Sequence, residues 1–169
     1  MALSAGTPLQ GLAQQFAPAS VVRLMTGLAV AGGASAISCY PADEAVQALW
    51  QGACGSVIAF DVEGHFEAST LAVCANAWWL DQLAALSQWM ATTTGMREDQ
   101  ARALLACNMA DVPQMLALYP AHTPAQLARF IGSPGTYTEQ GLNHLQTQAA
   151  HVPWVQALEQ LFARMNKAQ

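Results

Sequence analysis

The feature that most constrains this chain is one long segment, residues 66–93, that is apolar in almost every direction around a helix. The spacing of its large apolar residues predicts a helix, and they include Trp78, Trp79, Leu83, Trp89 and Met90. A helix that lacks a polar face has to be buried on most of its sides. In a chain of 169 residues the most economical cover is a second copy of the chain. The segment therefore predicts a homodimer, and it is also consistent with a higher oligomer.

The composition of the chain agrees with this surplus of apolar surface. Hydrophobic residues make up 53% of the sequence and charged residues only 10%, whereas an average soluble domain has roughly 25% charged residues. Intrinsic disorder requires low hydrophobicity and high net charge, so it is excluded. Six Lys and Arg against eleven Asp and Glu give a net charge of −5, which excludes nucleic-acid binding through a basic surface. We expect a helix-rich globular protein.

One charge-free stretch, residues 24–42, is long enough to cross a bilayer. It is interrupted by Gly27, Gly32, Gly33 and Pro41, and no Lys cluster flanks it. The basic start and Leu-rich run that a signal peptide requires are not found in this sequence. We therefore expect no membrane partner and a cytoplasmic location.

Cysteine and histidine are scattered along the chain rather than grouped. They are Cys39, Cys54, Cys74, Cys107, His65, His122, His144 and His151. No Cys-x-x-Cys, His-x-His or His-Glu-x-x-His pattern occurs among them, so we expect no metal. In a reducing compartment such cysteines are most simply small buried apolar residues.

The first part of the chain has the alternation of short strands and helices that is typical of the edge of an α/β sheet. Thr7-Pro8 predicts a helix start, because proline is favoured at the first helical position. That helix is expected to end near Phe16. Strands are predicted at residues 20–25, 34–39 and 55–60, and a helix at residues 41–51.

From Gly64 onward the pattern is helical throughout. After the apolar segment, a second helix is expected at residues 97–119, with Pro113 inside it as a kink. Its apolar stripe consists of Ala101, Leu104, Leu105, Met109, Val112 and Leu116. Further helices are predicted at 124–131, 137–150 and from Pro153 to Met165. Together they predict an all-helical bundle.

Three motifs follow one another toward the end of the chain: Thr123-Pro124-Ala125-Gln126-Leu127, then Ser133-Pro134-Gly135-Thr136-Tyr137-Thr138, then Gly141-Leu142. They resemble the His-Pro-x-x-Leu, Ser-Pro-Gly-Gly-Thr-Thr and Gly-Leu motifs of the pyrroline-5-carboxylate reductase family at the same spacing. Upstream, Val21-Val22-Arg23-Leu24-Met25 is similar to the family's Val-Val-Arg-x-Met strand. Ala77-Trp78-Trp79 falls where the family has Ala-Tyr-Phe.

The resemblance implies a mainly α fold in two domains. Residues 1–62 would be the C-terminal remnant of a Rossmann-like α/β domain, and residues 63–169 an all-helical dimerisation domain that interlocks with its twin. The chain would correspond to roughly the last three-fifths of a family member. The implied reaction is the reduction of a cyclic imine carboxylate, in proline-type metabolism, with NADP or NAD as cofactor.

The resemblance and the residues together suggest which side chains bind ligands. Backbone N–H groups at a helix start, beside a threonine hydroxyl, can hold a substrate carboxylate; the alternative is a capped helix start that binds nothing. The substrate-binding candidates are Ser133, Gly135, Thr136, Tyr137, Thr138, Cys74 and Asn76. The cofactor-binding candidates are Met25, Thr26 and Gly27. No catalytic residue is assigned.

The chain also departs from the family pattern. It contains no Gly-x-Gly-x-x-Gly turn for a pyrophosphate, so we expect no cofactor to bind tightly to this chain alone. The family's Pro-Asn-Thr-Pro is Thr26-Gly27-Leu28-Ala29 here, which loses an asparagine near the nicotinamide. The Ser-Gly-Ser-Gly-Pro loop becomes Ala72-Val73-Cys74-Ala75-Asn76, and Thr136-Tyr137 replace glycine and threonine.

Two functions are consistent with these matches and departures. One is that the chain is the substrate-side and dimerisation portion of a reductase, with the dinucleotide-binding half either missing from this chain or supplied by a separate dinucleotide-binding partner. The other is a catalytically inactive homodimeric scaffold or small-acid-binding module. Strand edges within residues 20–60 offer a place for a partner protein or a second copy to pair.

Overall fold

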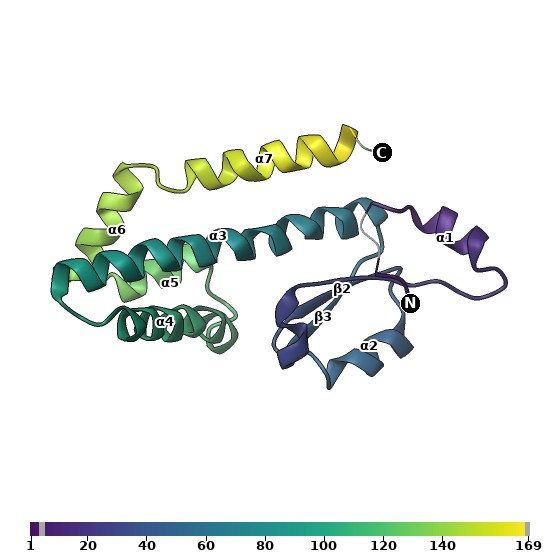
Figure 1. Cartoon of the computed structure of the whole chain (residues 1–169), viewed down its shortest axis with the longest axis horizontal. Coiled ribbons are helices and arrows are strands. Elements are labelled where there is room, and N and C mark those ends of the chain that lie inside the picture. Colours follow the sequence, from purple (N-terminus) through teal and green to yellow (C-terminus); the bar gives the residue numbers. More distant parts are fainter. Residues whose placement is uncertain (4–5, 168–169) are drawn as a thin grey trace. The chain divides into compact units, whose positions relative to one another are not determined.

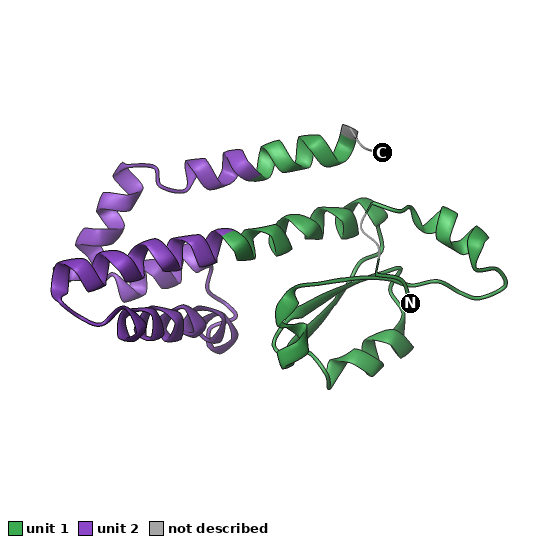
Figure 2. Cartoon of the chain, in the orientation of Figure 1, with its two compact units in different colours: residues 1–77, 158–169 green, residues 78–157 purple. Residues whose placement is uncertain are grey.

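The computed structural model of this chain describes residues 1–3 and 6–167. They form two compact units, shown in different colours in Figure 2: residues 1–77 with 158–169, and residues 78–157. We call these unit 1 and unit 2 and describe each by itself. The long helix α3 (Glu63–Thr94) begins where the predicted second domain does, at residue 63. The units divide inside that helix, so the predicted domain division at 62/63 stays a prediction.

Unit 1 contains a small sheet in the order β1-β2-β3 (Figure 1). β1 (Arg23–Thr26) and β2 (Ala36–Tyr40) are antiparallel, whereas β2 and β3 (Ser56–Ala59) are parallel. Helix α2 (Glu44–Gln51) connects the parallel pair and begins at Asp43, whose Oδ1 accepts a hydrogen bond from the Val46 N–H at 2.9 Å. The predicted α/β part is therefore confirmed, with strand boundaries shifted by one to three residues.

Two short helices complete the N-terminal part. α1 (Leu9–Gln15) lies where the Thr7-Pro8 pair predicts a helix. The 3-10 helix η1 (Leu28–Gly32) occupies the connection between β1 and β2, for which the sequence predicts only a loop. It ends at Gly33, whose φ of +71° is in the left-handed region that glycine adopts without strain.

The core of unit 1 lies on one face of β1 and β2. Because side chains alternate across a strand, Val22 and Leu24 point to one face and Arg23 and Met25 to the other. The buried core cluster consists of Val22, Leu24, Ile37, Cys39 and Cys54. The opposite face of β1 is therefore left for helix α3, and it carries an arginine.

Unit 2 consists of helical segments only. α4 (Glu98–Leu118), α5 (Pro124–Ile131) and α6 (Tyr137–Thr147) follow α3 along the chain. The last helix, α7 (Val152–Lys167), belongs to unit 2 up to residue 157 and to unit 1 from residue 158. Within the unit, the Trp154 ring of α7 lies 4.4 Å from that of Trp79 and 5.8 Å from that of Trp78, measured between centroids. The mainly helical fold class is confirmed, although α6 ends three residues before the predicted residue 150.

Much of the apolar surface of unit 2 is exposed. Leu80 is 66% exposed and Trp89 is 59% exposed on α3. Of the predicted stripe on α4, Ala101 is buried, but Leu104 and Val112 are exposed. The helices of the unit therefore leave many of their large apolar residues uncovered.

The cysteines differ in burial. Cys39 and Cys54 are buried, Cys74 is half-buried and Cys107 is exposed. The prediction of buried thiols is therefore wrong for Cys107, because α4 buries little of its surface within the chain. No helix among residues 1–3 and 6–167 is long and apolar enough to span a membrane. In the same residues, no three His, Cys, Asp or Glu side chains gather as a metal site would require.

Candidate functional site

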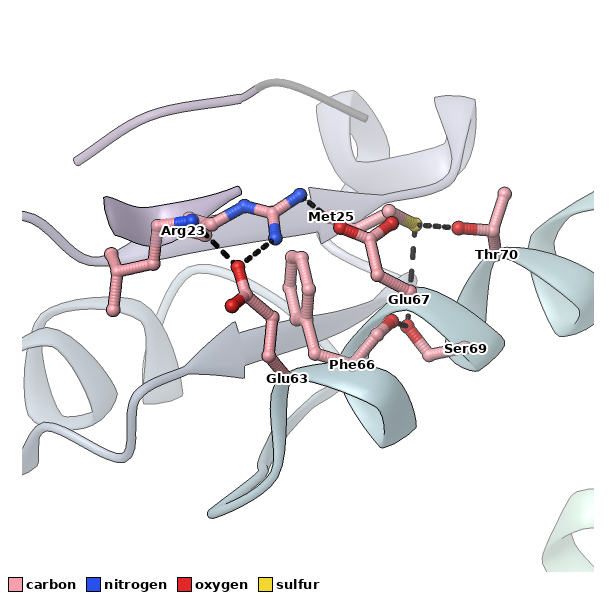
Figure 3. A network of polar contacts seen from close by, with 8 residues as sticks. Arg23, Met25, Glu63, Phe66, Glu67, Ser69 and Thr70 are labelled. Atoms are coloured by element: carbon pink, nitrogen blue, oxygen red, sulfur yellow. Dashed lines mark hydrogen bonds and ion pairs between the residues drawn. The ribbon is translucent and has the colours of Figure 1, made fainter. Parts of the chain in front are cut away.

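The most enclosed polar residue of unit 1 is Arg23, on the face of β1 opposite the apolar core (Figure 3). Its side chain is fully buried. Its Nη1 lies 2.7 Å from Glu63 Oε1, and its Nη2 pairs with Glu67 Oε1. The Phe66 ring centroid lies 4.7 Å from the guanidinium carbon. We call these four residues the Arg23 clamp, because it joins β1 to the first turns of α3.

The Glu63 carboxylate also reaches a third element. Its Oε1 accepts a hydrogen bond from the Leu9 N–H, the first residue of α1, at 2.6 Å. Glu67 is almost fully buried, whereas the Glu63 side chain is 33% exposed. One carboxylate therefore ties together the starts of α1 and α3 and the strand β1.

Sequence reasoning used Arg23 only as part of a matching motif and missed its partners. Two signals were available. An arginine stands alone within the apolar stretch Val21–Met25, and Glu63 and Glu67 are four residues apart, which places them on one side of a helix. Neither signal indicates that the two belong together, because they are separated by 40 residues or more.

Further along β1, the contacts with α3 continue in step. The Thr70 hydroxyl donates to Met25 Sδ at 2.9 Å (Figure 3). A Cβ placed on Gly27 would lie 3.2 Å from Asn76 Nδ2 and 3.2 Å from Ser35 Oγ. The structure therefore brings Gly27, one of the predicted cofactor-binding residues, close to Asn76, one of the predicted substrate-binding residues.

Hydroxyl groups surround this end of β1. The Gly27 N–H donates to Ser35 Oγ at 3.2 Å, and the Thr26 and Ser35 hydroxyls lie 3.4 Å apart. Ser35 is nearly buried and Asn76 is exposed. Cys74 is half-buried on the same helix. Together these residues carry both hydrogen-bond donors and hydrogen-bond acceptors, namely a backbone N–H, two hydroxyls and a carboxamide.

The second predicted group, residues 133–138, lies in unit 2 at the start of α6. Gly135 has a φ of +85°, and its N–H donates to Glu139 Oε2 at 2.7 Å. In return, the Glu139 N–H donates to Thr136 Oγ1 at 3.1 Å. The Thr136 hydroxyl donates to the Ser133 carbonyl at 2.8 Å. The start of α6 is thus capped, with Thr136 as the N-cap and a carboxylate of the chain itself on the loop.

Glu139 was missed by the sequence reasoning, although Thr136-x-x-Glu139 matches the capping-box pattern. Tyr137 is 92% exposed and Thr138 is exposed, so neither side chain is engaged by the unit. The loop geometry is that of a helix cap. Binding of a ligand carboxylate there stays a prediction.

Electrostatic shifts occur away from these groups. Burial raises the pKa of the Cys39 thiol, which lies in the core of unit 1. A hydrogen bond from Arg97 lowers the pKa of the exposed Asp99 carboxyl. Neither residue lies beside the candidates, and both shifts have a local cause.

Unit 2 also carries an open groove of about 440 Å³ along α4. The residues that line it are Met96, Gln100, Ala103, Leu104 and Cys107. The groove is continuous with the exposed apolar residues of the same helix, so it forms part of the uncovered surface of the unit.

Comparison with known proteins decides the family. Residues 63–168 match the family described as pyrroline-5-carboxylate reductase dimerisation. The chain belongs to this family. The match covers α3 to α7, so the resemblance inferred from three short motifs is confirmed. A comparison with curated proteins found no match.

Solved structures of pyrroline-5-carboxylate reductases have the same fold. The Coxiella burnetii enzyme is 22% identical, with a TM-score of 0.82 over 99% of this chain and 64% of its own. The Streptococcus pyogenes enzyme is 19% identical, with a TM-score of 0.78 over 96% of this chain and 65% of its own. The Plasmodium falciparum pyrroline carboxylate reductase, solved with NADP bound, is 16% identical, with a TM-score of 0.77 over 97% and 68%. This member of the dimerisation family therefore spans about two thirds of the length of these structures.

Proposed function

We propose that this chain is the substrate-side and dimerisation portion of a pyrroline-5-carboxylate-reductase-like enzyme, which reduces a cyclic imine carboxylate in proline biosynthesis. The observation that carries the proposal is the family match over residues 63–168. The reaction is a hydride transfer, and NADPH or NADH supplies the hydride when bound. The contribution of the protein is then binding and orientation rather than the chemical step.

The residues at the end of β1 suit only one end of such a cofactor. Thr26, Ser35 and Asn76 offer hydrogen-bonding groups to a nicotinamide carboxamide. The Gly-x-Gly-x-x-Gly turn that would hold a pyrophosphate at a helix start does not occur in the sequence. We therefore propose that the dinucleotide is held mainly by a separate dinucleotide-binding partner, and only weakly by this chain.

We propose a homodimer built by unit 2. The support is its exposed apolar surface, because contiguous apolar patches on a protein surface mark interaction sites. The large exposed residues on α3 and α4 in this unit include Trp79, Leu80, Leu86, Trp89, Leu104 and Val112. A second copy that presents the same surface covers both at once. If surface remains, a higher oligomer follows.

The loop at residues 133–138 is the proposed carboxylate site. A substrate carboxylate would accept from the Gly135 N–H in place of Glu139 Oε2. Substrate binding therefore requires the Glu139 side chain to leave the loop. The exposed Tyr137 and Thr138 then border the bound acid, and Cys74 and Asn76 stay candidates from α3.

The second candidate function is a catalytically inactive homodimeric scaffold or small-acid-binding module. The observation that favours it is the same Glu139 contact, because a carboxylate of the chain already occupies the donor that the substrate would need. The cytoplasmic location remains a prediction from the sequence alone.

One experiment separates these functions. The full chain is mixed with NADPH up to millimolar concentration, and tryptophan fluorescence, melting temperature and mass by light scattering are measured. Quenching or a higher melting temperature, with a dimer mass, supports the reductase portion. A dimer without any response to NADPH supports the scaffold. A monomer contradicts both forms of the proposal, since each requires unit 2 to be covered by a copy.

A further inference from the structure

Within unit 1, strand β1 and the first turns of α3 touch at three successive points. Arg23 meets Glu63, Phe66 and Glu67; Met25 meets Thr70; and Gly27 meets Asn76 (Figure 3 shows the first two). Both elements advance in the same direction along this series. The four residue steps from Arg23 to Gly27 cover roughly 13 Å of extended chain, and the helix residues from about 65 to 76 cover roughly 16 Å. The match makes the three contacts one continuous register.

Of the three contacts, the first is the most demanding. The Thr70–Met25 contact is a single hydrogen bond between neutral groups, whose net contribution is modest, and the Gly27–Asn76 contact is a non-directional van der Waals contact. The buried guanidinium fixes the helix more strictly, because a shift by one turn leaves at least one buried charge without its partner. Arg23 has a carboxylate on each of its two terminal nitrogens and an aromatic ring against its face. A helix displaced by a turn would present no such set.

We propose that Arg23 is a positioning residue: the Arg23 clamp sets the register of α3 along β1 and thereby holds the Asn76 carboxamide against Gly27. Buried ion pairs contribute little net stability, and setting register is the best-attested use of buried polar groups. The clamp thereby determines how Gly27 and Asn76 are placed at the end of β1, although Arg23 itself lies at the first of the three contacts.

Gly27 is the second half of this arrangement. A Cβ at this position would stand 3.2 Å from both Asn76 Nδ2 and Ser35 Oγ, closer than a Cβ normally lies to another heavy atom. Glycine therefore leaves the room that the carboxamide occupies. The consequence for a ligand rests on the proposed function. The nicotinamide end of the cofactor would contact the Asn76 carboxamide, and the position of that carboxamide depends on Arg23, which does not contact it.

The test measures the register directly by a cross-link. The chain carries Gly27→Cys and Asn76→Cys, with Cys74→Ser and Cys107→Ser to remove competing thiols. Disulfide formation under mild oxidation is followed by peptide mass spectrometry. The cross-linking rate is compared between the parent chain, which keeps Arg23, and the neutral variant R23M/E63Q/E67Q. This variant removes the three charges together and leaves no unpaired charge. We expect the cross-link to form at least tenfold more slowly in the neutral variant, with the circular dichroism of the folded chain retained.

A matched control separates register from general loosening. Asp43→Ala removes the cap of α2 in the same unit without touching α3. We expect its cross-link rate to stay within twofold of the parent. An unchanged rate in the neutral variant, or an equal slowing in both variants, would overturn the proposal. If the neutral variant does not fold, Arg23→Lys serves in its place, because one ammonium cannot hold two carboxylates in the same fork geometry; an unchanged rate there likewise overturns it.

The cross-link needs no cofactor, substrate or dimer, so its outcome is independent of the proposed function. A second measurement addresses the ligand. Where NADPH quenches the tryptophan fluorescence, the neutral variant without the added cysteines is expected to bind it at least tenfold more weakly. A slower cross-link with unchanged NADPH affinity would overturn the link from register to ligand. No NADPH response in any variant would instead count against the proposed function.

Discussion

Unit 1 of this chain buries a charged side chain, whereas unit 2 exposes large aromatic side chains. In unit 1 the guanidinium of Arg23 has no exposed surface at all, whereas in unit 2 the indole of Trp89 is 59% exposed. Proteins ordinarily place these residue types the other way round. In unit 1 the buried charge has its partners in the same chain. In unit 2 the exposed apolar residues have no such cover, which is the condition that a second copy would satisfy.

The two units therefore differ in how these unusual residues find partners. A buried charge has to be paired during folding of the chain itself, because an unpaired one costs several kcal/mol. Exposed apolar surface costs much less per residue and persists until association. The following predictions test this difference between the units, and the variant with the strongest effect comes first.

Removal of the buried cation should have the largest effect. Arg23→Met removes the buried cation that pairs with the carboxylates of Glu63 and Glu67, and breaking a buried pair in this way costs about 3–5 kcal/mol. Urea unfolding at fixed protein concentration measures the loss. The control is R23M/E63Q/E67Q, which we expect to recover most of the stability. A single variant as stable as the parent would contradict a paired buried charge.

A charge on the exposed apolar face of unit 2 should act on association instead. Leu80→Asp places a carboxylate where we propose that the second copy packs, and the loss of a central interface residue costs about 2–4 kcal/mol. The dimer dissociation constant should then rise at least 30-fold. Sedimentation over a range of concentrations measures it. Gln82→Asp, an exposed polar position on the same helix, is the matched control. Equal dissociation constants in the two variants would show that α3 is not the interface.

Helix caps should matter to a similar degree in both units. Asp43 caps α2 in unit 1, and Thr123 forms a capping box with Gln126 at the start of α5 in unit 2. Each change to alanine removes a hydrogen bond to an otherwise unpaired N–H and should cost about 1 kcal/mol. Thermal unfolding measures both. A loss above about 3 kcal/mol in either variant would indicate a role beyond capping.

The smallest perturbation compares two thiols. Cys39 lies in the core of unit 1, and burial raises its pKa; Cys107 is exposed in unit 2. Since the thiolate is the reactive form, Cys39 should be alkylated much more slowly than Cys107 at pH 8. The raised pKa means that the folded state favours the neutral thiol, so its contribution to stability is complete at neutral pH and falls as the pH rises above the range of an ordinary thiol. Peptide mass spectrometry after iodoacetamide treatment measures both rates. Equal rates would show that the reagent reaches Cys39 as readily as Cys107, which would mean that the core of unit 1 opens easily.

The parts of this structure that were predicted depend on nearby residues. The change from an α/β pattern to a helical one, the helix at residues 124–131 and the long helix follow from spacings of a few residues, and each is present. The 3-10 helix Leu28–Gly32 and the early end of α6 were missed, because weak turns depend on their surroundings. A capped start of α6 was one of the two alternatives, but the contact of Glu139 with the loop was not predicted, although Thr136-x-x-Glu139 matches the capping-box pattern.

The sequence by itself determined the family, the order of helices and strands, and the surplus of apolar surface, because periodicity, caps and short motifs act within one or two turns of chain. Only the tertiary structure decided that Arg23 is buried between two glutamates of α3, that Asn76 lies against Gly27, and that Cys107 and Trp89 stay exposed. Those facts depend on how elements 40 or more residues apart meet, or on surfaces that the chain leaves uncovered. Hydrophobic patterning states which residues seek burial, but only the packed chain decides which of them find it.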